Sequence, residues 1–416
     1  MTRELLRQGH ISLGALKVIR RLTEAGYQAY VVGGCVRDIL LGKSPKDFDV
    51  ATDAHPDEVR DLFRNARLIG KRFRIVHIRY GPEIVEVATF RAPHNEVETE
   101  MNFSEGGMIL SDNIYGTFDE DVHRRDFTMN ALYYQPETDT LVDAVDGLTD
   151  IENQRIRLIG EPEDRFREDP VRMLRAIRFK AKLGFAIDPL VEASMRRLGF
   201  LLQDIPPARL FEEVLKLFMN GHGEASFEEL LNYELYGWLF PSSRRALEDT
   251  GAQALVQLAL RSTDQRIQEG KPVTPAFVLA ALLWHPYQQR LNKLLAEGMT
   301  SIAAGHEAGA QVIAEQQLCT SIPKRFSGPM RDIWSLQFRL PMQQAKKAET
   351  TMRHKRFRAA YDFLLLREES GEIAPGLGEW WTAYQQESDP EARAQMAAGS
   401  GGRRRRRRRR KSPAAS

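Results

Sequence analysis

The spacing of the apolar residues changes near residue 160, and this change most limits the folds open to the chain. Before it, short apolar runs of strand length alternate with short helical segments, separated by glycine and proline. After it, the strand signals fade and apolar residues recur at helical spacing. The sequence therefore predicts an α/β head with a mixed sheet, followed by an all-α region.

The predicted head is built from strand–turn–helix units. Residues 27–34 indicate a strand that enters a glycine turn, and residues 35–42 indicate a short helix. Residues 47–52 indicate a second strand, and residues 53–66 a helix that Asp53 can cap. A β-hairpin is predicted on the two sides of a Gly-Pro turn that follows.

Cysteine usage and hydropathy narrow the setting in which the chain works. Only Cys35 and Cys319 occur in 416 residues, so no disulfide framework is expected and a reducing compartment is indicated. No apolar run reaches the roughly 18 residues that a membrane helix needs. The first residues are interrupted by charges and lack the apolar stretch of a secretory signal. We expect a cytoplasmic protein with no transmembrane segment.

The charges are distributed unevenly along the chain. Residues 403–411, RRRRRRRRK, hold nine of the 59 basic side chains, so the rest carries 50 basic and 57 acidic residues, or −7. Arginine binds phosphate bidentately, which favours a disordered tail that supplies affinity for nucleic acid. A tail that only improves solubility explains the same composition.

Asp47 and Asp49 lie two positions apart in the sequence KDFDV. Alternate residues of a strand face the same side, so both carboxylates would lie opposite Phe48 and Val50, with Cα atoms about 6–7 Å apart. Such a pair suits oxygen ligands that converge on one or two hard cations. A solvated strand face is the alternative interpretation.

Gly33 and Gly34 separate the first strand from its helix and precede these aspartates. Two glycines allow a phosphate to approach the backbone N–H groups at the start of a helix. Arg37, on the first turn of that helix, could hold a phosphate oxygen. Taken alone, a Gly-Gly pair is more simply a turn.

Two further charged groups lie in the predicted head. Glu86 stands between two valines of the hairpin, where a carboxylate is costly unless it is paired or metal-bound; an exposed edge strand is the alternative. The sequence RRDFTMN places four polar residues beside Phe127, either as a solvated turn or to position a triphosphate and ribose. They are Arg124, Arg125, Asp126 and Asn130.

Three stretches together resemble one branch of the nucleotidyltransferase superfamily. They are VVGGCVRDILLGKSPKDFDVAT, RRDFTMNAL and EDPVRMLRAIRF. That branch holds the bacterial poly(A) polymerases and the CCA-adding tRNA enzymes, and the resemblance spans about residues 27–220 and more loosely reaches residue 367. It implies a polymerase-β-like catalytic head followed by a helical neck and body.

The resemblance also implies roles for single residues. Asp47 and Asp49 would bind the metal ion, with Asp126 ranked ahead of Glu86 as the further carboxylate. The metal would be Mg²⁺, with Mn²⁺ as an alternative, and ATP the substrate. Two such ions can lower the pKa of an RNA 3′-hydroxyl and stabilise the leaving pyrophosphate. The phosphate-binding turn would comprise Gly33, Gly34 and Arg37.

The sequence REDPVRMLRAIRF carries the implied base-recognition group. By resemblance Glu168, Asp169 and Arg172 line the nucleotide pocket, with Arg175 on the same helical face. Asp169 followed by Pro170 also fits a helix start, with aspartate as N-cap and proline at N1. The two interpretations are compatible.

Two features favour A addition over CCA addition. The sequence PARLFEE resembles the neck of the poly(A) polymerases, and a basic tail suits an enzyme that accepts many RNA 3′ ends. In the predicted body, cations alternate with aromatic rings and could follow an RNA backbone, although Trp334 and Phe338 at i, i+4 are typical of a core. The candidate RNA-binding residues are Lys324, Arg325, Lys355, Arg356, Arg403, Arg404 and Arg405.

The sequence thus predicts template-independent polyadenylation of RNA 3′ ends, with RNA-decay proteins as expected partners. CCA addition to tRNA is the alternative, and an inactive RNA-binding scaffold is a third interpretation that the intact aspartate pair disfavours. The expected parts of the chain are a first helix, a catalytic head, a neck, a body and a tail. They span residues 1–26, 27–160, 161–222, 223–385 and 386–416.

Overall fold

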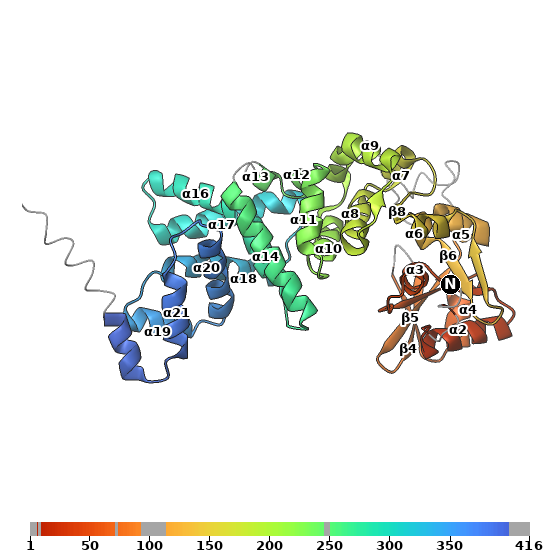
Figure 1. Cartoon of the computed structure of the whole chain (residues 1–416), viewed down its shortest axis with the longest axis horizontal. Coiled ribbons are helices and arrows are strands. Elements are labelled where there is room, and N and C mark those ends of the chain that lie inside the picture. Colours follow the sequence, from red (N-terminus) through yellow and green to blue (C-terminus); the bar gives the residue numbers. More distant parts are fainter. Residues whose placement is uncertain (1–5, 7–9, 71–73, 93–113, 245–249, 399–416) are drawn as a thin grey trace, which may run out of the picture. The chain divides into compact units, whose positions relative to one another are not determined.

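The computed structural model describes residues 6, 10–70, 74–92, 114–244 and 250–398 (Figure 1). The chain divides into two compact units, Met1–Asp204 and Ile205–Ser416. None of the described helices is both long enough and apolar enough to cross a membrane. The basic tail lies outside the described residues.

The first unit is built on a seven-stranded mixed sheet with the order β3-β4-β5-β2-β1-β6-β7. β2 and β5 pair in parallel, and the other neighbours pair antiparallel. The strands are β1 (Ala29–Val32), β2 (Phe48–Thr52), β3 (Ala66–Ile69), β4 (Ile75–Tyr80), β5 (Glu83–Thr89), β6 (Leu132–Gln135) and β7 (Thr140–Asp143). The predicted mixed sheet and hairpin are confirmed.

Among the described residues, helices cover one face of this sheet and leave part of the other face exposed. α2 (Leu13–Glu24) packs on β1, β2 and β5, and α4 (Pro56–Leu62) packs on β3, β4 and β5. Buried valines alternate along β5 with exposed or half-exposed residues, as a sheet with one covered face requires. The remaining short helices of the head are α3 (Gly34–Leu40), α5 (Phe118–Arg124), η1 (Thr128–Asn130) and α6 (Gly147–Glu152).

The predicted helix over 53–66 is wrong at both ends. The helix begins after His55, with Pro56 at its first turn, while Asp53 accepts a hydrogen bond from the Gln28 backbone N–H at 2.8 Å instead of capping it. It ends at Leu62, and the chain then enters β3, a strand that the apolar pattern does not predict.

The predicted neck also contains a break. A helical period over 163–183 is divided into α7 (Pro162–Glu168) and α8 (Val171–Leu183), because the residue before a proline avoids helical backbone angles. Asp169 accordingly has φ −150° and ends α7, while Pro170 occupies the N-cap of α8. Two strands, β8 (Arg155–Ile156) and β9 (Ala186–Ile187), then α9 (Pro189–Leu198) and η2 (Gly199–Asp204), complete the unit.

The second unit is helical throughout its described residues. Trp334 is buried and stacks on Tyr287 with ring centroids 4.4 Å apart, which confirms that this tryptophan belongs to the core. Its helices are α10 (Pro207–Phe218), α11 (Gly223–Asn232), α12 (Tyr236–Leu239), α13 (Pro241–Arg244), α14 (Thr250–Gln268), α15 (Pro275–Leu282), α16 (Trp284–Ala296), α17 (Ser301–Cys319), α18 (Lys324–Arg339), α19 (Ala345–Met352), α20 (Phe357–Glu369) and α21 (Leu377–Gln386).

Polar contacts join the predicted head to the first part of the predicted neck. Asp38 on α3 accepts from the Lys182 ammonium on α8 at 2.9 Å, and Arg175 on α8 pairs with Asp126 at 2.5 Å. The compact first unit therefore continues to Asp204, beyond residue 160. The functional boundaries at 160, 222 and 385 stay predictions.

Candidate active site

A pair of carboxylates lies on two neighbouring strands of the first unit. Along β2, Phe48 and Val50 are buried and Asp49 is exposed, so Asp49 faces the side of the sheet opposite the core. Glu86 on β5 is the direct parallel partner of Asp49. Asp47 is exposed one residue before β2 begins. The sheet register thus brings Glu86, remote in sequence, next to the predicted aspartates.

The pKa of Asp49 shows that negative charge outweighs positive charge around the carboxylates of Asp47, Asp49 and Glu86. Solvent reaches the side chain, but protein atoms crowd its carboxyl, and this loss of hydration is the main reason its pKa rises to about 6. Repulsion from Glu86 and Asp47 raises the pKa further, while Arg125 opposes the rise. No lysine or arginine among the described residues forms an ion pair with Asp49. Such a donor set matches a hard cation.

The carboxylates do not form a complete metal cage. Within the described residues, no three His, Cys, Asp or Glu side chains are grouped closely enough to hold a metal ion by themselves. His77 on β4 lies beside Glu86, with Nε2 3.2 Å from Oε1 but without hydrogen-bond geometry. A cation here would need further ligands from substrate oxygens or water, which is how Mg²⁺ is commonly bound next to phosphates.

The glycine turn adjoins these strands as predicted. Gly33 follows β1 with φ +83°, a conformation that favours glycine, and α3 starts at Gly34. A Cβ at Gly33 would lie 3.8 Å from Nη1 of Arg125, so that guanidinium is next to the turn.

The side chain of Arg37, for which a phosphate contact is predicted, is paired within the chain. It is buried, and its Nε and Nη2 donate to Asp38 while Nη1 donates to Oδ1 of Asn130 at 2.5 Å. Its guanidinium also lies over the ring of Phe179 on α8. In this structure Arg37 and Asn130 therefore connect α3, η1 and α8 behind the turn.

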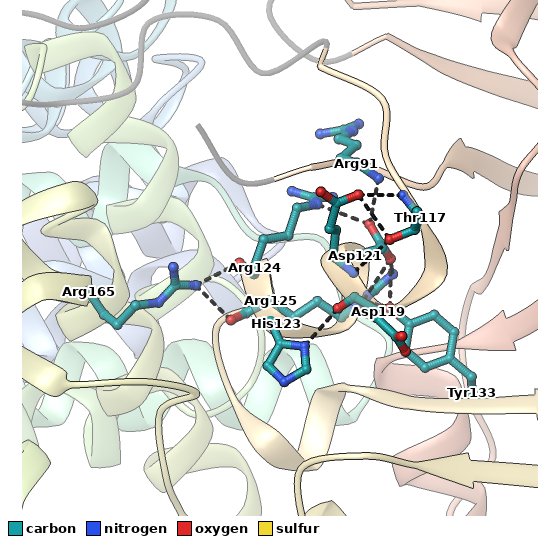
Figure 2. A network of polar contacts seen from close by, with 10 residues as sticks. Arg91, Thr117, Asp119, Asp121, His123, Arg124, Arg125, Tyr133 and Arg165 are labelled. Carbon is teal, nitrogen blue, oxygen red and sulfur yellow. Dashed lines mark hydrogen bonds and ion pairs between the residues drawn. The ribbon is translucent and has the colours of Figure 1, made fainter. Parts of the chain in front are cut away.

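Arg125 is held in place by a buried acidic group. Figure 2 shows Asp121 of α5 at the centre of a network of polar contacts. Arg125 donates Nη2 to Asp121 at 2.9 Å and Nε to the Tyr133 hydroxyl at 2.5 Å, and Arg124 donates Nε to Asp121 at 3.0 Å. Nη1 of Arg125 makes no hydrogen bond to the described residues and faces the Gly33 turn. The network thus fixes one guanidinium group beside the glycine turn.

Asp126 is paired within the chain. Its Oδ2 accepts from Arg175, and its Oδ1 accepts from the Phe127 backbone N–H at 2.8 Å. Burial alone would raise the pKa of Asp126, but attraction to Arg175 and the Phe127 hydrogen bond lower it. The geometry therefore favours Glu86 over Asp126 as the carboxylate next to Asp49, the reverse of the ranking made from the sequence.

Glu168 and Arg172 lie in a cluster with Arg165, a residue that the sequence pattern does not single out. Oε2 of Glu168 accepts from Arg165 at 2.5 Å and from Arg172 at 2.7 Å. Arg165 also donates to the backbone carbonyls of Arg124 and Arg125 (Figure 2). Burial and the nearby Arg172 lower the pKa of Arg165 to about 10. Arg165 is half-buried and Arg167, two residues later, is exposed. No local sequence pattern distinguishes these two arginines.

Candidate RNA contacts in the second unit are mostly at the surface. Lys324, Arg325 and Lys355 are exposed, while Arg356 is half-buried. A hollow of about 450 Å³ lies between α17, α18 and α19. Its lining includes Ile302, Phe338, Met342, Arg331, Arg339, Lys346 and Lys347. Arg403, Arg404 and Arg405 lie outside the described residues.

The fold and the site define a class: the first unit is the head of a polymerase-β-like nucleotidyltransferase. The model "Poly A polymerase head domain" matches residues 29–157. "Probable RNA and SrmB- binding site of polymerase A" matches 184–247, and "Polymerase A arginine-rich C-terminus" matches 297–413. Among solved structures, a CCA-adding enzyme of Bacillus stearothermophilus with CTP is 24% identical with a TM-score of 0.53, covering 91% of this chain and 81% of that one. A Thermotoga maritima CCA-adding enzyme with tRNA is 18% identical with a TM-score of 0.59, covering 96% and 98%.

Curated relatives give the family. Poly(A) polymerase I of Salmonella typhimurium is 47% identical over 395 residues, which cover 93% of this chain and 85% of that protein. Poly(A) polymerase I of Haemophilus influenzae is 44% identical over 92% and 87% of the two chains. A CCA-adding enzyme of Lactobacillus helveticus is 36% identical over 54% of each. The chain belongs to the poly(A) polymerase family of nucleotidyltransferases.

Proposed function

We propose that this enzyme adds AMP residues from ATP to RNA 3′ ends without a template and releases pyrophosphate. The observation that carries the proposal is the juxtaposition of Asp49 and Glu86 with the Gly33 turn and the fixed cation of Arg125. Nucleotidyl transfer needs a polarised α-phosphate, a deprotonated hydroxyl and neutralised phosphate charge. The carboxylates would hold a cation for the first two, and the Gly33 turn and Arg125 would neutralise phosphate charge. Identity of 47% to poly(A) polymerase I over most of the chain supports A addition.

The metal site is a proposal of its own. Asp47, Asp49 and Glu86 would hold Mg²⁺ together with triphosphate oxygens and water. Bound as a pair, Mg²⁺ ions would lower the pKa of the RNA 3′-hydroxyl and neutralise charge on the phosphates. The raised pKa of Asp49 and the absence of an ion pair at this residue in the described structure support a cation there.

The protein's own residues position the nucleotide. The backbone at Gly33–Gly34 and the Nη1 of Arg125 would bind the β- and γ-phosphates, because Asp121 and Tyr133 already fix the rest of that guanidinium. Glu168 and Arg172 are oriented by Arg165, which leaves a rigid polar group to read the adenine edge. Arg37, on the helix that follows the turn, and Asn130 on η1 would hold the turn in place through their hydrogen bond.

In the cell, we propose that the added tails mark RNA for decay in the cytoplasm, with decay proteins as partners. Two free cysteines fit a reducing compartment, and the basic run at residues 403–411 fits a broad range of RNA substrates.

A primer-extension assay tests the activity. Purified protein is incubated with Mg²⁺, a short unstructured RNA and each nucleoside triphosphate separately. A long ladder with ATP alone is expected. Addition confined to C, C and A on a tRNA that lacks its end would support CCA addition, the activity named for relatives that match about half of this chain. RNA binding without any product would support an inactive scaffold.

Asp49→Asn tests the carboxylate site. The amide keeps the shape of the side chain but removes the charge that a cation needs, so we expect at least a 10³-fold loss of kcat with RNA binding retained. Glu86→Gln should also reduce kcat, by more than Asp57→Asn, a surface control on α4. An active Asp49→Asn enzyme would exclude the metal site.

A further inference from the structure

In-line transfer determines the side from which the RNA must approach. The attacking hydroxyl and the leaving pyrophosphate lie on opposite sides of the α-phosphorus. The Gly33 turn and Arg125 adjoin β1 and β6, so the leaving phosphates lie on that side of Asp49. The 3′-hydroxyl must then arrive from the side of β5, β4 and β3.

A hollow of about 600 Å³ lies on that side of the sheet. Its size is within the roughly 300–1,000 Å³ of ligand sites. Ile69 and Ile84 contribute exposed apolar surface, at 42% and 43% exposure. Its lining includes Arg64, Arg67, Arg79 and His77. Apolar surface beside guanidinium groups matches the two faces of a nucleotide, a base and a phosphate.

Strand register connects this hollow with the carboxylates. Arg67 on β3 pairs with His77 on β4, His77 pairs with Glu86 on β5, and Glu86 pairs with Asp49 on β2. The four residues form one row across the open face of the sheet. Neighbouring strands are about 4.8 Å apart, so Arg67 lies about 14 Å from Asp49 along the row. One strand of a DNA duplex carries a phosphate about every 3.4 Å along the axis, and at that spacing this distance spans about four nucleotides.

The hollow carries positive charge that the protein leaves unbalanced. None of the guanidinium groups of Arg64, Arg67 and Arg79 forms an ion pair with an acidic side chain of the described residues. Among the described residues, the Arg79 guanidinium donates Nε to the Gly81 carbonyl at 2.9 Å, which orients it on the hairpin. On α4 nearby, in contrast, Arg60 pairs with Asp57 and Asp61.

We propose that the hollow on β3, β4 and β5 binds the RNA strand about two to four nucleotides upstream of the reacting 3′ end. Arg64, Arg67 and Arg79 bind its phosphates, and separate bases lie on Ile69 and on Ile84, whose partners Ile75 and Arg79 stand four residues apart on β4. This inference rests on the proposed function, because it takes the reacting 3′ end to lie at Asp49. It makes the open sheet face a positioning surface for the primer, distinct from the nucleotide pocket.

The test compares Arg67→Ala and the double variant Arg64→Ala/Arg67→Ala with Arg20→Ala. Arg20 is an exposed arginine on α2, paired with Glu24, on the covered side of the sheet. Fluorescence anisotropy measures binding of oligoadenylates of two to eight nucleotides without ATP, and initial rates give KM for the same RNAs. Thermal unfolding checks that each variant is folded.

For the wild type, affinity should rise steeply as the RNA lengthens from two to about five nucleotides. The double variant should lose most of that rise, with KM for the longer RNAs raised about tenfold or more, while Arg67→Lys should recover part of it. For each phosphate that is no longer bound, the slope of log K against log salt should become less steep by about 0.7. If the affinity of the double variant rises with RNA length as steeply as that of Arg20→Ala, the proposal is wrong. Because binding is measured without ATP, this result stands even if the wild type adds no AMP.

Discussion

Asp121 shows how a buried charge can fix the position of other charged side chains. It is almost fully buried, and two arginines and the Tyr133 hydroxyl surround its carboxylate (Figure 2). Burial, the largest single effect, would raise the pKa of Asp121, but Arg125, Arg124 and Tyr133 together lower it to about 2. Folding therefore favours the ionised form of Asp121. Its ion pairs with Arg125 and Arg124 offset the loss of hydration of the buried carboxylate, and they fix Arg125 at the Gly33 turn.

Asp121→Asn should destabilise the first unit by about 2–4 kcal/mol at pH 7, because Arg125 stays buried without its partner. The folded pKa lies below the ordinary 3.8, so the stabilising effect is complete above pH 4 and is lost as the pH falls towards 2. Denaturant unfolding should show the same difference in stability between wild type and variant at pH 7 and pH 5, and a smaller difference at pH 3. A gap independent of pH would contradict this assignment. Asp57→Asn, which removes a surface pair, should change stability by less than about 1 kcal/mol.

At the level of elements, the packing of α6 on η1 fixes the loop that carries Asn130. A Cβ added at Gly147, the first residue of α6, would lie 2.4 Å from the Thr128 carbonyl oxygen. Thr128 in turn donates its hydroxyl to the buried Asp150 at 2.6 Å. Because η1 also presents Asn130 to Arg37, a shift of this contact reaches the glycine turn.

Gly147→Ala should cost about 1–3 kcal/mol of stability through this clash and should reduce kcat by displacing η1. Gly309→Ala is the matched control: this glycine lies inside α17 and its Cβ would make an ordinary contact of 3.5 Å with Trp334, so alanine should stabilise by up to about 1 kcal/mol. Thermal unfolding and single-nucleotide incorporation measure both. Equal stability of the two variants would show that the contact between α6 and η1 is not rigid.

Across the whole chain, the charge of the tail contrasts with that of the remaining residues. The nine basic residues of 403–411 adjoin a chain of net charge −7, so long-range attraction to a polyanion depends strongly on this segment. The exposed cations of the second unit, among them Lys346 and Lys347, provide a second region of positive charge.

Replacing residues 403–411 by an equally long Gly/Ser segment should weaken RNA binding and reduce its salt dependence. Each phosphate contact releases counterions, so the slope of log K against log salt should become less steep by up to about 6. Anisotropy titrations between 50 and 200 mM salt provide the measurement. An unchanged slope would assign the tail to a protein partner instead of RNA.

Local patterns predicted the strands around Gly33, Asp49 and Glu86, because alternation and turn residues depend only on near neighbours. They did not predict β3, because the apolar spacing of residues 53–66 continues past the real end of α4. They also failed to distinguish the buried Arg37 and the half-buried Arg165 from exposed arginines, since both stand in short polar stretches like those of surface residues. Burial of a charge depends on partners far away in sequence.

The amino-acid sequence determines the order of the elements, with an α/β head before the helices. It also determines which residue types are present to bind a nucleotide and a metal. Which of these residues meet follows from the folded chain. Sheet register places Glu86 beside Asp49. Asp126 is paired with Arg175. Arg37 is paired with Asp38 and Asn130. The physical reason is that charges are balanced through space, and contact between remote segments follows from topology, which no local spacing records.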